Sequence, residues 1–500
     1  MLNSAQRARA RCLREGGVAP RNPSVSDADI LGGTPLVLGT DCSGVDAPMW
    51  ALRCLWPRQP CVHAFASDNW IVAEQVVRAN SSCGRFFTDM LARSPEQIPP
   101  HNLYVCGFPC QPFSTLHNGT KLFAEAKAKP FRAVLSVLTR SRPQVAVLEN
   151  VPGIVRARSQ LERALRRIGG YCITMLRLDP RLFGEPVCRP RVYIVCVRLD
   201  VLVCSSRGAV DTMVSEILQS IKKPVTCTAA DRLLPHTHPL VRKRLVNTRR
   251  TGQSTKGATA TSRPPKWKTD HHAFRKRFPA ARAGGVPPVR LLTGAREQEA
   301  WQLLCSVRPS LQAADVSQSI YRLPCRDSGC LPTITPKGAI VVRSLGRAML
   351  GIEKLLIHAV PVHRLVIPPS VNETALHRLG GQTMHVHCVA AAILVGCALV
   401  DWRSPAARSG VSPPSVGVAW PVSWLGAWPE QSNSNPCQSN GDNKPRAKSR
   451  HIRATPRQPS ALGVSSAGAP RPRPQRQVAA APLKRPAVDV ATKDLRALFG

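Results

Sequence analysis

The feature that most constrains this chain is a short apolar segment, Leu103 to Cys106, followed at once by Gly-Phe-Pro-Cys-Gln-Pro-Phe-Ser at residues 107–114. A brief β-branched and aromatic run that stops at glycine and proline predicts a buried strand leading into a loop. Open α/β sheets carry their reactive groups on loops at the carboxyl ends of parallel strands. Cys110, in this loop, is therefore a candidate nucleophile; the alternative is a buried, inert thiol in a turn.

Two further apolar segments carry groups that would assist such a nucleophile. The run from Gln144 to Val151 predicts a second strand, which ends in an acid, Glu149. A carboxyl group beside a reactive thiol is a candidate acid in catalysis. Arg189 and Arg191 stand two residues apart at the mouth of a third strand, so strand alternation would direct both side chains to one face.

A cofactor site is indicated near the start of the chain. Residues 36–40 predict a strand, residues 41–46 a turn of small residues, and Ala47 to Cys54 a helix, the order typical of a nucleotide-type cofactor site. Asp68 ends the next strand roughly 20 residues further on, where an acid can bond ribose hydroxyls. Asp89 is a third acid, which could hold an adenine amine.

Taken in order, these segments resemble the cytosine-C5 DNA methyltransferase family. Residues 107–114 match the family's nucleophile motif without a gap, residues 149–151 match its Glu-Asn-Val motif, and residues 189–195 match its Arg-x-Arg motif with the strand that follows. Weaker matches are Ser43-Gly44 and Asp68 to the first two cofactor motifs, and residues 331–335 and 380–384 to the last two motifs. The resemblance extends from about residue 34 to about residue 400.

The resemblance implies an α/β fold: a Rossmann-like, S-adenosylmethionine-dependent methyltransferase core with a small basic target-recognition region and a disordered tail. The expected parts are a disordered basic arm (1–33), the catalytic core (34–200), the basic recognition region (201–330), a segment returning to the core (331–400) and a Pro/Arg/Ser-rich disordered tail (401–500). The alternative for the basic region is an insert with no fold of its own.

The implied activity is transfer of a methyl group from S-adenosylmethionine to C5 of a flipped-out cytosine in DNA. C5 is too weak a nucleophile to take the methyl group directly, whereas a thiolate that adds at C6 converts the ring into an enamine. Cys110 would be that nucleophile. Glu149 would act as the acid at N3, since burial favours its protonated form, and Arg191 with Arg189 would stabilise charge developing at O2.

The resemblance also assigns binding residues. The expected cofactor contacts are Cys42, Ser43, Gly44, Val45, Asp46, Asp68, Asp89, Gly107, Pro109, Gln382 and Thr383. The expected DNA contacts are Gln111, Ser114, Arg242, Lys243, Arg244, Arg275, Lys276 and Arg277. Because the target base must leave the stack, residues 115–129 are expected to form a loop that closes over it.

The chain departs from the family pattern at the cofactor turn. Cys42 stands where an aromatic residue is usual, and Asp46 where a second glycine is usual, so we expect a crowded turn and altered cofactor affinity. Val187 replaces a glutamine of the arginine motif, and Gln382 replaces an asparagine of the last motif. The catalytic set is complete, whereas the cofactor set is divergent.

Composition supports a polyanionic partner. The formal net charge is +39 and the pI is about 10.8, which favours nucleic acid. Residues 241–282 hold thirteen Lys or Arg and one acid, with Trp267 and Phe274 between them. The order along the chain places this segment where the family has its recognition region.

Other classes of site are not indicated. Eighteen scattered cysteines without a secretory signal favour free thiols in a reducing compartment, and no spacing fits a metal site. Val386 to Val400 predicts a core helix and not a membrane span. We expect a monomer in the nucleus, with an organelle or the bacterial cytoplasm as alternatives, and an organelle presequence as the alternative for residues 1–33.

Two other functions remain open from the sequence. A tRNA cytosine-5 methyltransferase would use the same cysteine, but that branch of the family usually carries a Cys-Phe-Thr signature, which this chain lacks. A catalytically degenerate relative that binds DNA would have the divergent cofactor turn. RNA is therefore an alternative substrate. A degenerate protein would be distinguished by its failure to bind S-adenosylmethionine.

Overall fold

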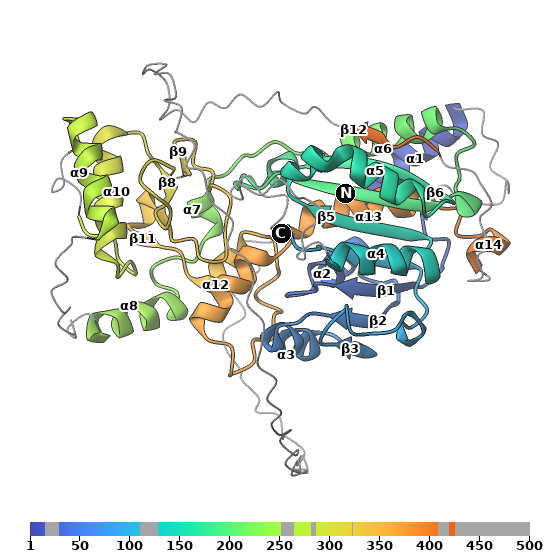
Figure 1. The fold of residues 1–500 in the computed structure, drawn as a ribbon, viewed down its shortest axis with the longest axis horizontal. Coiled ribbons are helices and arrows are strands. Elements are labelled where there is room, and N and C mark those ends of the chain that lie inside the picture. Colours follow the sequence, from blue (N-terminus) through green and yellow to red (C-terminus); the bar gives the residue numbers. More distant parts are fainter. Residues whose placement is uncertain are drawn as a thin grey trace, which may run out of the picture. The chain divides into compact units, whose positions relative to one another are not determined.

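An eight-stranded mixed sheet forms the centre of the fold, with strand order β12-β6-β7-β5-β4-β1-β2-β3 (Figure 1). Its strands are β1 (Leu36–Asp41), β2 (Cys61–Ser67), β3 (Arg85–Phe87), β4 (Leu103–Cys106), β5 (Val145–Asn150), β6 (Tyr171–Leu178), β7 (Arg191–Arg198) and β12 (Ser423–Leu425). Neighbours are parallel except that β7 is antiparallel to both β5 and β6. The expected Rossmann-like α/β fold is confirmed in this computed structural model.

The structure describes residues 1–15, 30–110, 129–251, 265–281, 287–322, 324–408 and 420–425. All of them belong to one unit, Met1–Glu430. The helices associated with the main sheet are α1 (Leu2–Glu15), α2 (Ala47–Leu55), α3 (Ile71–Asn80), α4 (Lys129–Arg140), α5 (Arg158–Arg166), α6 (Arg207–Ile221) and α13 (Val386–Ala398). Short 3-10 turns lie at η1 (Pro95–Gln97), η5 (Pro152–Ala157), η6 (Pro180–Leu182), η7 (Leu199–Val201) and η8 (Arg343–Leu345).

Two apolar cores lie on opposite faces of this sheet because strand residues alternate between faces. One core joins α2, α6 and α13 to residues such as Val105 and Val147, and the other joins α4 and α5 to residues such as Tyr104 and Leu148. Both faces of the central strands are therefore buried, which explains why these strands read as continuous apolar runs.

Helix α13 is the predicted core helix. By length and composition the stretch Glu373–Ala398 would suit a membrane span, but 89% of its apolar window is buried inside the protein. The stretch is also divided, because α12 (Glu373–Gln382) ends before α13 begins. α13 contacts α2, β5 and β7, so it returns the chain to the main sheet as expected.

The expectation of a disordered arm over residues 1–33 is wrong for its first part. α1 packs on α6 and α13, with Ala5 and Ala8 buried, and Arg9 Nε donates to the carbonyl oxygen of Ala398 at 2.8 Å. Small residues on one face of α1 allow this close packing. The basic, acid-poor composition of the segment gave no sign of this buried face. Residues 16–29 lie outside the described residues.

The expected disordered tail also contains ordered structure. After the short helix α14 (Pro405–Arg408), β12 adds to the edge of the main sheet, parallel to β6. Its Trp424 Nε1 donates to Glu162 Oε1 at 2.7 Å, which fixes the strand against α5. Three residues are too few for a recognisable strand pattern, so β12 could not be predicted from the sequence. Residues 426–500 lie outside the described residues.

A second, four-stranded sheet has the order β11-β10-β8-β9. Its strands are β8 (Ala313–Asp315), β9 (Cys325–Arg326), β10 (Ile340–Val342) and β11 (Arg347–Ala348), and helices α9 (Lys266–Arg277) and α10 (Ala295–Val307) pack on it. The remaining helices are α7 (Ala229–Arg232), α8 (Pro239–Thr251) and α11 (Gly351–Leu356).

The second sheet does not fit the domain limits that were expected at residues 200 and 330. Phe274 of α9, Trp301 of α10 and Val341 of β10 share one apolar core, so the described part of the basic region has a fold of its own. The limit predicted at residue 330 falls inside the sheet, because β10 and β11 come after it. At the other end, α6 contacts α1 and α13 and so belongs to the main sheet, not to the recognition region.

Candidate active site

The order of the strands places the site at the carboxyl ends of β1 and β4. The chain winds from β1 outward to β3 and then returns to β4 on the other side of β1. This reversal creates a crevice between the loops that leave β1 and β4, where open α/β sheets bind their ligands. The predicted cofactor turn follows β1, and the loop of Cys110 follows β4.

The Cys110 loop is held by contacts with its neighbours. Asn150, which is buried, donates from Nδ2 to the carbonyl oxygen of Phe108 at 3.1 Å. Gly107 permits close approach, because a Cβ on it would lie 2.6 Å from Met384 Cε and 3.3 Å from Glu149 Oε2. Cys110 is thus at the junction of β4, β5 and the segment before α13. Asn150 and Met384 were not predicted as site residues, although Asn150 lies within the Glu-Asn-Val motif.

Glu149 and Arg191 form an ion pair beside this loop. Arg191 Nε lies 2.9 Å from Glu149 Oε1, and each side chain is only 13% exposed. Strand pairing explains the contact: Glu149 is opposite Tyr193 in the antiparallel pair of β5 and β7, and Arg191 is two residues from Tyr193 on the same face. The predicted carboxyl and guanidinium groups are therefore adjacent.

The burial and the charges around Cys110 change the pKa of its thiol. Burial raises the pKa of Cys110, and the Glu149 carboxylate raises it further, whereas Arg191 and Arg189 lower it. The sum is a raised pKa, so the resting thiol is protonated at neutral pH. Arrival of a group that neutralises or displaces the negative charge of Glu149 would favour the thiolate.

Arg189 differs in role from Arg191 because it is bound to backbone carbonyl groups. It is buried, and its guanidinium donates to Ile334 at 2.7 Å, to Thr383 at 2.9 Å and to Gly381 at 3.2 Å. Burial, and then the charge of Arg191, lowers the pKa of Arg189. The three carbonyl groups belong to the two C-terminal motifs, so Arg189 joins those motifs to β7 and is a positioning residue in this structure.

This arrangement predicts unequal effects of the two arginines on stability. Arg189→Lys keeps a positive charge but cannot reach three carbonyl groups, and we expect it to lower the free energy of unfolding by about 2 to 4 kcal/mol. Arg191→Lys, which keeps its partner Glu149, should lower it by less than about 1 kcal/mol. Urea unfolding of both variants measures this difference; equal losses would contradict the positioning role of Arg189.

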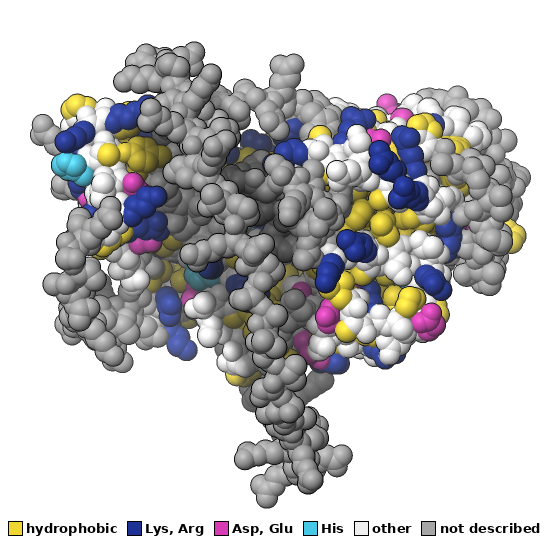
Figure 2. Space-filling view, viewed as in Figure 1, with side chains coloured by type: hydrophobic (Ala, Val, Ile, Leu, Met, Phe, Trp, Pro, Cys, Tyr) yellow, Lys and Arg dark blue, Asp and Glu magenta, His cyan; other side chains and the backbone are white. Residues whose placement is uncertain are grey.

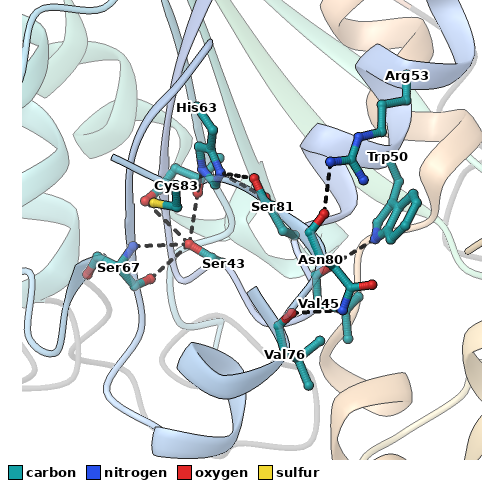
Figure 3. A network of polar contacts seen from close by, with 12 residues as sticks. Ser43, Val45, Trp50, Arg53, His63, Ser67, Val76, Asn80, Ser81 and Cys83 are labelled. Atoms are coloured by element: carbon teal, nitrogen blue, oxygen red, sulfur yellow. Dashed lines mark hydrogen bonds and ion pairs between the residues drawn. The ribbon is translucent and has the colours of Figure 1, made fainter. Parts of the chain in front are cut away.

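A hydrogen-bond network fixes the cofactor turn to the end of β2 (Figure 3). The Ser43 hydroxyl donates to the carbonyl oxygen of Ser67 at 3.1 Å and accepts from the Ser67 amide at 3.1 Å. The backbone amide of Ser43 also donates to that carbonyl oxygen, at 3.0 Å. The turn after β1 and the acid after β2 are therefore held together before any ligand binds.

Asp46, at the position where a glycine is usual, lies in the turn in an uncommon backbone conformation. It adopts a left-handed conformation with φ of 61°, which a glycine would adopt more readily. Its side chain is buried beneath α2, with Oδ2 3.4 Å from His63 Nδ1, and burial raises its pKa. Asp46 therefore stands in place of the second glycine with its side chain turned towards His63, and its part in cofactor binding stays a prediction.

The residues of the turn fit a nucleoside-type cofactor. Gly44 faces open space, since a Cβ on it would meet no atom within 4 Å. Asp68 accepts from the amides of Gly44 and Trp70 at 3.0 Å each, which sets its carboxylate beside that space. Asp89 is exposed on the loop after β3, and Ile71 offers an apolar surface that is 60% exposed. The open backbone at Gly44 and the Asp68 carboxylate beside it are groups that can hold the ribose of a nucleoside.

A buried clamp supports the loop of Asp89. Arg93 donates to both carboxylate oxygens of Asp41, at 2.7 and 2.5 Å, and the Tyr104 hydroxyl donates to the same carboxylate at 2.6 Å. The side chains of Arg93 and Asp41 are 3% and 0% exposed. The Arg93 guanidinium also lies 5.0 Å from the ring centroids of Phe65 and Phe87. This clamp is not predictable from the sequence, because Arg93 lies in a polar loop far from Asp41 along the chain.

The last motif lies close to the rest of the site. Gly381 permits α12 to approach the loop after Ile334, since a Cβ on it would lie 2.1 Å from the Pro336 nitrogen. Gln382 is exposed, whereas the Thr383 hydroxyl donates to the carbonyl oxygen of Leu379 at 2.6 Å. Val187 is buried and bridges to Leu331, so its apolar side chain packs in the core where a glutamine was expected.

The predicted DNA contacts are distributed over two helices. Arg242, Lys243 and Arg244 are exposed on α8, and Lys276 and Arg277 are exposed at the end of α9. Arg275 is instead ion-paired with Glu299 of α10, so it contributes to the fold of this region. Gln111, Ser114 and the loop predicted over residues 115–129 lie outside the described residues, except that α4 begins at Lys129.

Comparisons with known proteins find relatives for part of this chain. Residues 51–273 match the family model for C-5 cytosine-specific DNA methylase. The type II methyltransferase M.NgoBI of Neisseria gonorrhoeae is 30% identical over 149 residues, which are 29% of this chain and 46% of that protein. M.NlaX of Neisseria lactamica is 32% identical over 139 residues, 27% of this chain and 44% of that protein. The chain therefore matches less than half the length of these relatives.

Among solved structures, the S. pombe Dnmt2 methyltransferase is 16% identical, with a TM-score of 0.43 over 72% of this chain and 98% of that chain. The sequence match over residues 51–273 includes Cys110, Glu149 and Arg191, the three groups that the structure brings together. Over residues 51–273, the chain matches the C-5 cytosine-specific DNA methylase family.

Proposed function

We propose that this chain is a DNA (cytosine-5-)-methyltransferase that acts through a covalent bond between Cys110 and C6 of the target cytosine. The observation that carries the proposal is the grouping of Cys110 with the Glu149–Arg191 ion pair, at the edge where the cofactor turn also ends. A thiol, a carboxyl group and a guanidinium are the three groups that addition to a cytosine ring requires.

S-adenosylmethionine is the methyl donor used by this family, and we propose that this chain binds it at the turn after β1. Gly44 and its neighbours would lie against the amino-acid end of the cofactor, and Asp68 and Asp89 would hold its ribose and adenine. When bound, it supplies an electrophilic methyl group on a sulfonium centre.

In the proposed reaction the residues of the chain move protons and hold charge. The Cys110 thiol transfers its proton to the Glu149 carboxylate, and the resulting thiolate adds to C6. Negative charge then spreads from C5 towards N3 and O2 of the cytosine. Glu149 donates a hydrogen bond or a proton near N3, and Arg191 stabilises O2, so the ion pair between them opens towards the base. After C5 is methylated, a water molecule takes the C5 proton, the C5–C6 double bond forms again as the Cys110 thiolate leaves, and N3 returns its proton to Glu149.

DNA is the proposed substrate because of the family and the charge of the chain. The exposed cations of α8 and α9 are proposed to contact phosphates, which position a duplex but do not read its sequence. The target base must be turned out of the duplex to meet Cys110, because C6 is inaccessible within the base stack.

Methyl transfer to DNA tests the proposal. The chain is incubated with unmethylated duplex DNA and methyl-labelled S-adenosylmethionine, and the DNA is then digested to nucleosides. Label in 5-methylcytosine is expected. Label only in RNA in a parallel reaction would replace DNA as the substrate, and label in neither, with DNA binding retained, would mean a DNA-binding protein without this activity.

Replacing Glu149 with glutamine separates its two effects on the site. Methyl transfer should fall by about 10²- to 10⁴-fold, because the acid is lost. The Cys110 thiol should nevertheless become a thiolate at lower pH, because removal of the negative charge removes a cause of its raised pKa. Alkylation of Cys110 by iodoacetamide across a pH series, followed by mass spectrometry of its peptide, measures this shift.

The matched control for this experiment is Glu216→Gln, which removes a carboxylate on α6 that is not among the groups acting on Cys110. Its alkylation profile and its rate of methyl transfer should equal those of the wild type. An unchanged profile for Glu149→Gln would show that Glu149 does not act on the thiol, and would contradict the assigned site.

A further inference from the structure

Helices α4 and α5 present an exposed basic surface away from the active site. We call it the α4–α5 basic face, defined by the exposed cations Lys129, Arg132, Arg140, Arg158, Arg163, Arg166 and Arg167. Figure 2 shows Lys and Arg side chains gathered over the elements labelled α4 and α5 in Figure 1. None of these residues belongs to the cofactor, catalytic or recognition sets.

The charge of this face is poorly balanced by acids. Over residues 129–170 the chain has nine Lys or Arg and two acids, and one of those acids, Glu149, is in the active site. The other, Glu162, is shared: Arg158 Nε lies 2.8 Å from Oε1 and Arg166 Nη2 lies 3.4 Å from Oε2. Outside the two helices, Glu96 of η1 adds an acid near Arg140. The excess of positive charge favours an anionic partner.

The chemistry of the face favours phosphate groups. Six of its seven cations are arginines, whose planar guanidinium binds phosphate oxygens in pairs, whereas lysine acts as a point charge. Ser159, Glu162, Arg163, Arg166 and Arg167 line one hollow, so the cations of α5 converge on a common space. With twelve residues, α4 is about 18 Å long, which matches about five base pairs of duplex DNA.

The position of the face separates it from the active site. β5 ends at Asn150, next to Glu149 on the catalytic edge, and α5 then runs back to the start of β6, so Arg166 and Arg167 lie towards the opposite edge of the sheet. The apolar sides of α4 and α5 are buried against the sheet, which leaves their basic sides facing outward. A short duplex held over Cys110 would not cover these residues.

We infer that the α4–α5 basic face is a second binding surface for the phosphate backbone of duplex DNA, one that holds DNA beyond the segment at the active site. This inference rests on DNA being the partner under the proposed function. It does not depend on methyl transfer, so binding measurements alone decide it.

The test compares Arg163→Glu/Arg167→Glu with a matched control, Arg58→Glu/Arg85→Glu, which changes the same number of exposed arginines on other elements. Affinity for a 12-base-pair and a 40-base-pair duplex with the same single target is measured from 50 to 200 mM salt. For the 40-base-pair duplex, the α5 variant should bind about tenfold more weakly, with a salt slope lower by roughly 1.8, about 0.9 for each phosphate that is no longer neutralised. Binding and methylation of the 12-base-pair duplex should equal those of the wild type.

Several outcomes would overturn the inference. An unchanged affinity of the α5 variant for the long duplex would show that the α4–α5 basic face does not bind DNA. An equal loss of affinity in the control variant would show that any loss of positive charge weakens binding. Equal losses for short and long duplexes would place the face within the target site itself. The neutral variant Arg163→Gln/Arg167→Gln, which disturbs the helix less, should give the same change in salt slope. If wild-type protein binds both duplexes equally and methylates neither, the proposed function fails as a separate result.

Discussion

Replacing Cys110 with serine is expected to reduce methyl transfer by more than about 1,000-fold while DNA binding is unchanged. A serine hydroxyl is a much weaker nucleophile than a thiol at neutral pH, and a carboxylate such as Glu149 is too weak a base to ionise it. The contacts that hold the loop involve the backbone of Phe108 and the glycine at residue 107, not the thiol. The substitution should therefore leave the fold intact.

Measurements of rate and of binding separate this prediction from simple unfolding. The rate of 5-methylcytosine formation should fall in Cys110→Ser, and the dissociation constants for DNA and S-adenosylmethionine should remain within about twofold of the wild type. The matched control is Cys54→Ser, which changes an exposed thiol near the end of α2 that is not among the site residues. A serine variant that retains most of the activity would exclude Cys110 as the nucleophile.

Breaking the Arg93–Asp41 clamp is expected to have the largest effect on stability. Among the described residues, Arg93→Met leaves the Tyr104 hydroxyl as the one hydrogen-bond partner of the buried Asp41 carboxylate, and the loss of one partner of a buried ion pair costs about 3 to 5 kcal/mol. Affinity for S-adenosylmethionine should also fall, because Arg93 holds the loop that carries Asp89. Urea unfolding and calorimetric titration of the cofactor measure the two effects.

A double variant tests whether the cost comes from the uncompensated charge. Asp41→Asn/Arg93→Met removes both charges, so it should regain much of the stability lost in Arg93→Met alone. Cofactor affinity should stay low in the double variant, because the loop remains unclamped. If the double variant were as unstable as the sum of the single variants, the two residues would not act as a pair.

The catalytic core was predictable because each group follows a strand. Apolar runs ending at Asp41, at Cys106 and at Glu149 give the order of the sheet edge, and the sheet then brings Cys110, Glu149 and Arg191 together. In the same way the apolar composition of residues 386–398 predicts a buried helix, which is α13. In these cases local pattern and tertiary position agree.

Other parts depend on contacts between residues that are far apart in sequence. Nothing near Arg189 indicates that its guanidinium binds three carbonyl groups from residues 334 to 383, so its sequence motif points to catalysis instead. The direction of the Asp46 side chain could not be predicted either, because it follows from a left-handed backbone conformation and from the contact with His63 on β2. From the sequence Arg275 resembles a DNA contact, whereas in the structure it forms an ion pair with Glu299.

Covalent trapping tests the central claim most directly. Duplex DNA with 5-fluorocytosine at the target position is incubated with the chain and S-adenosylmethionine, and the protein is digested and analysed by mass spectrometry. Fluorine cannot leave C5 as a proton does, so we expect a stable adduct in which the nucleotide is bonded to Cys110, present in the wild type and absent in Cys110→Ser. No adduct with the wild type, or one formed at a different residue, would contradict the proposed mechanism.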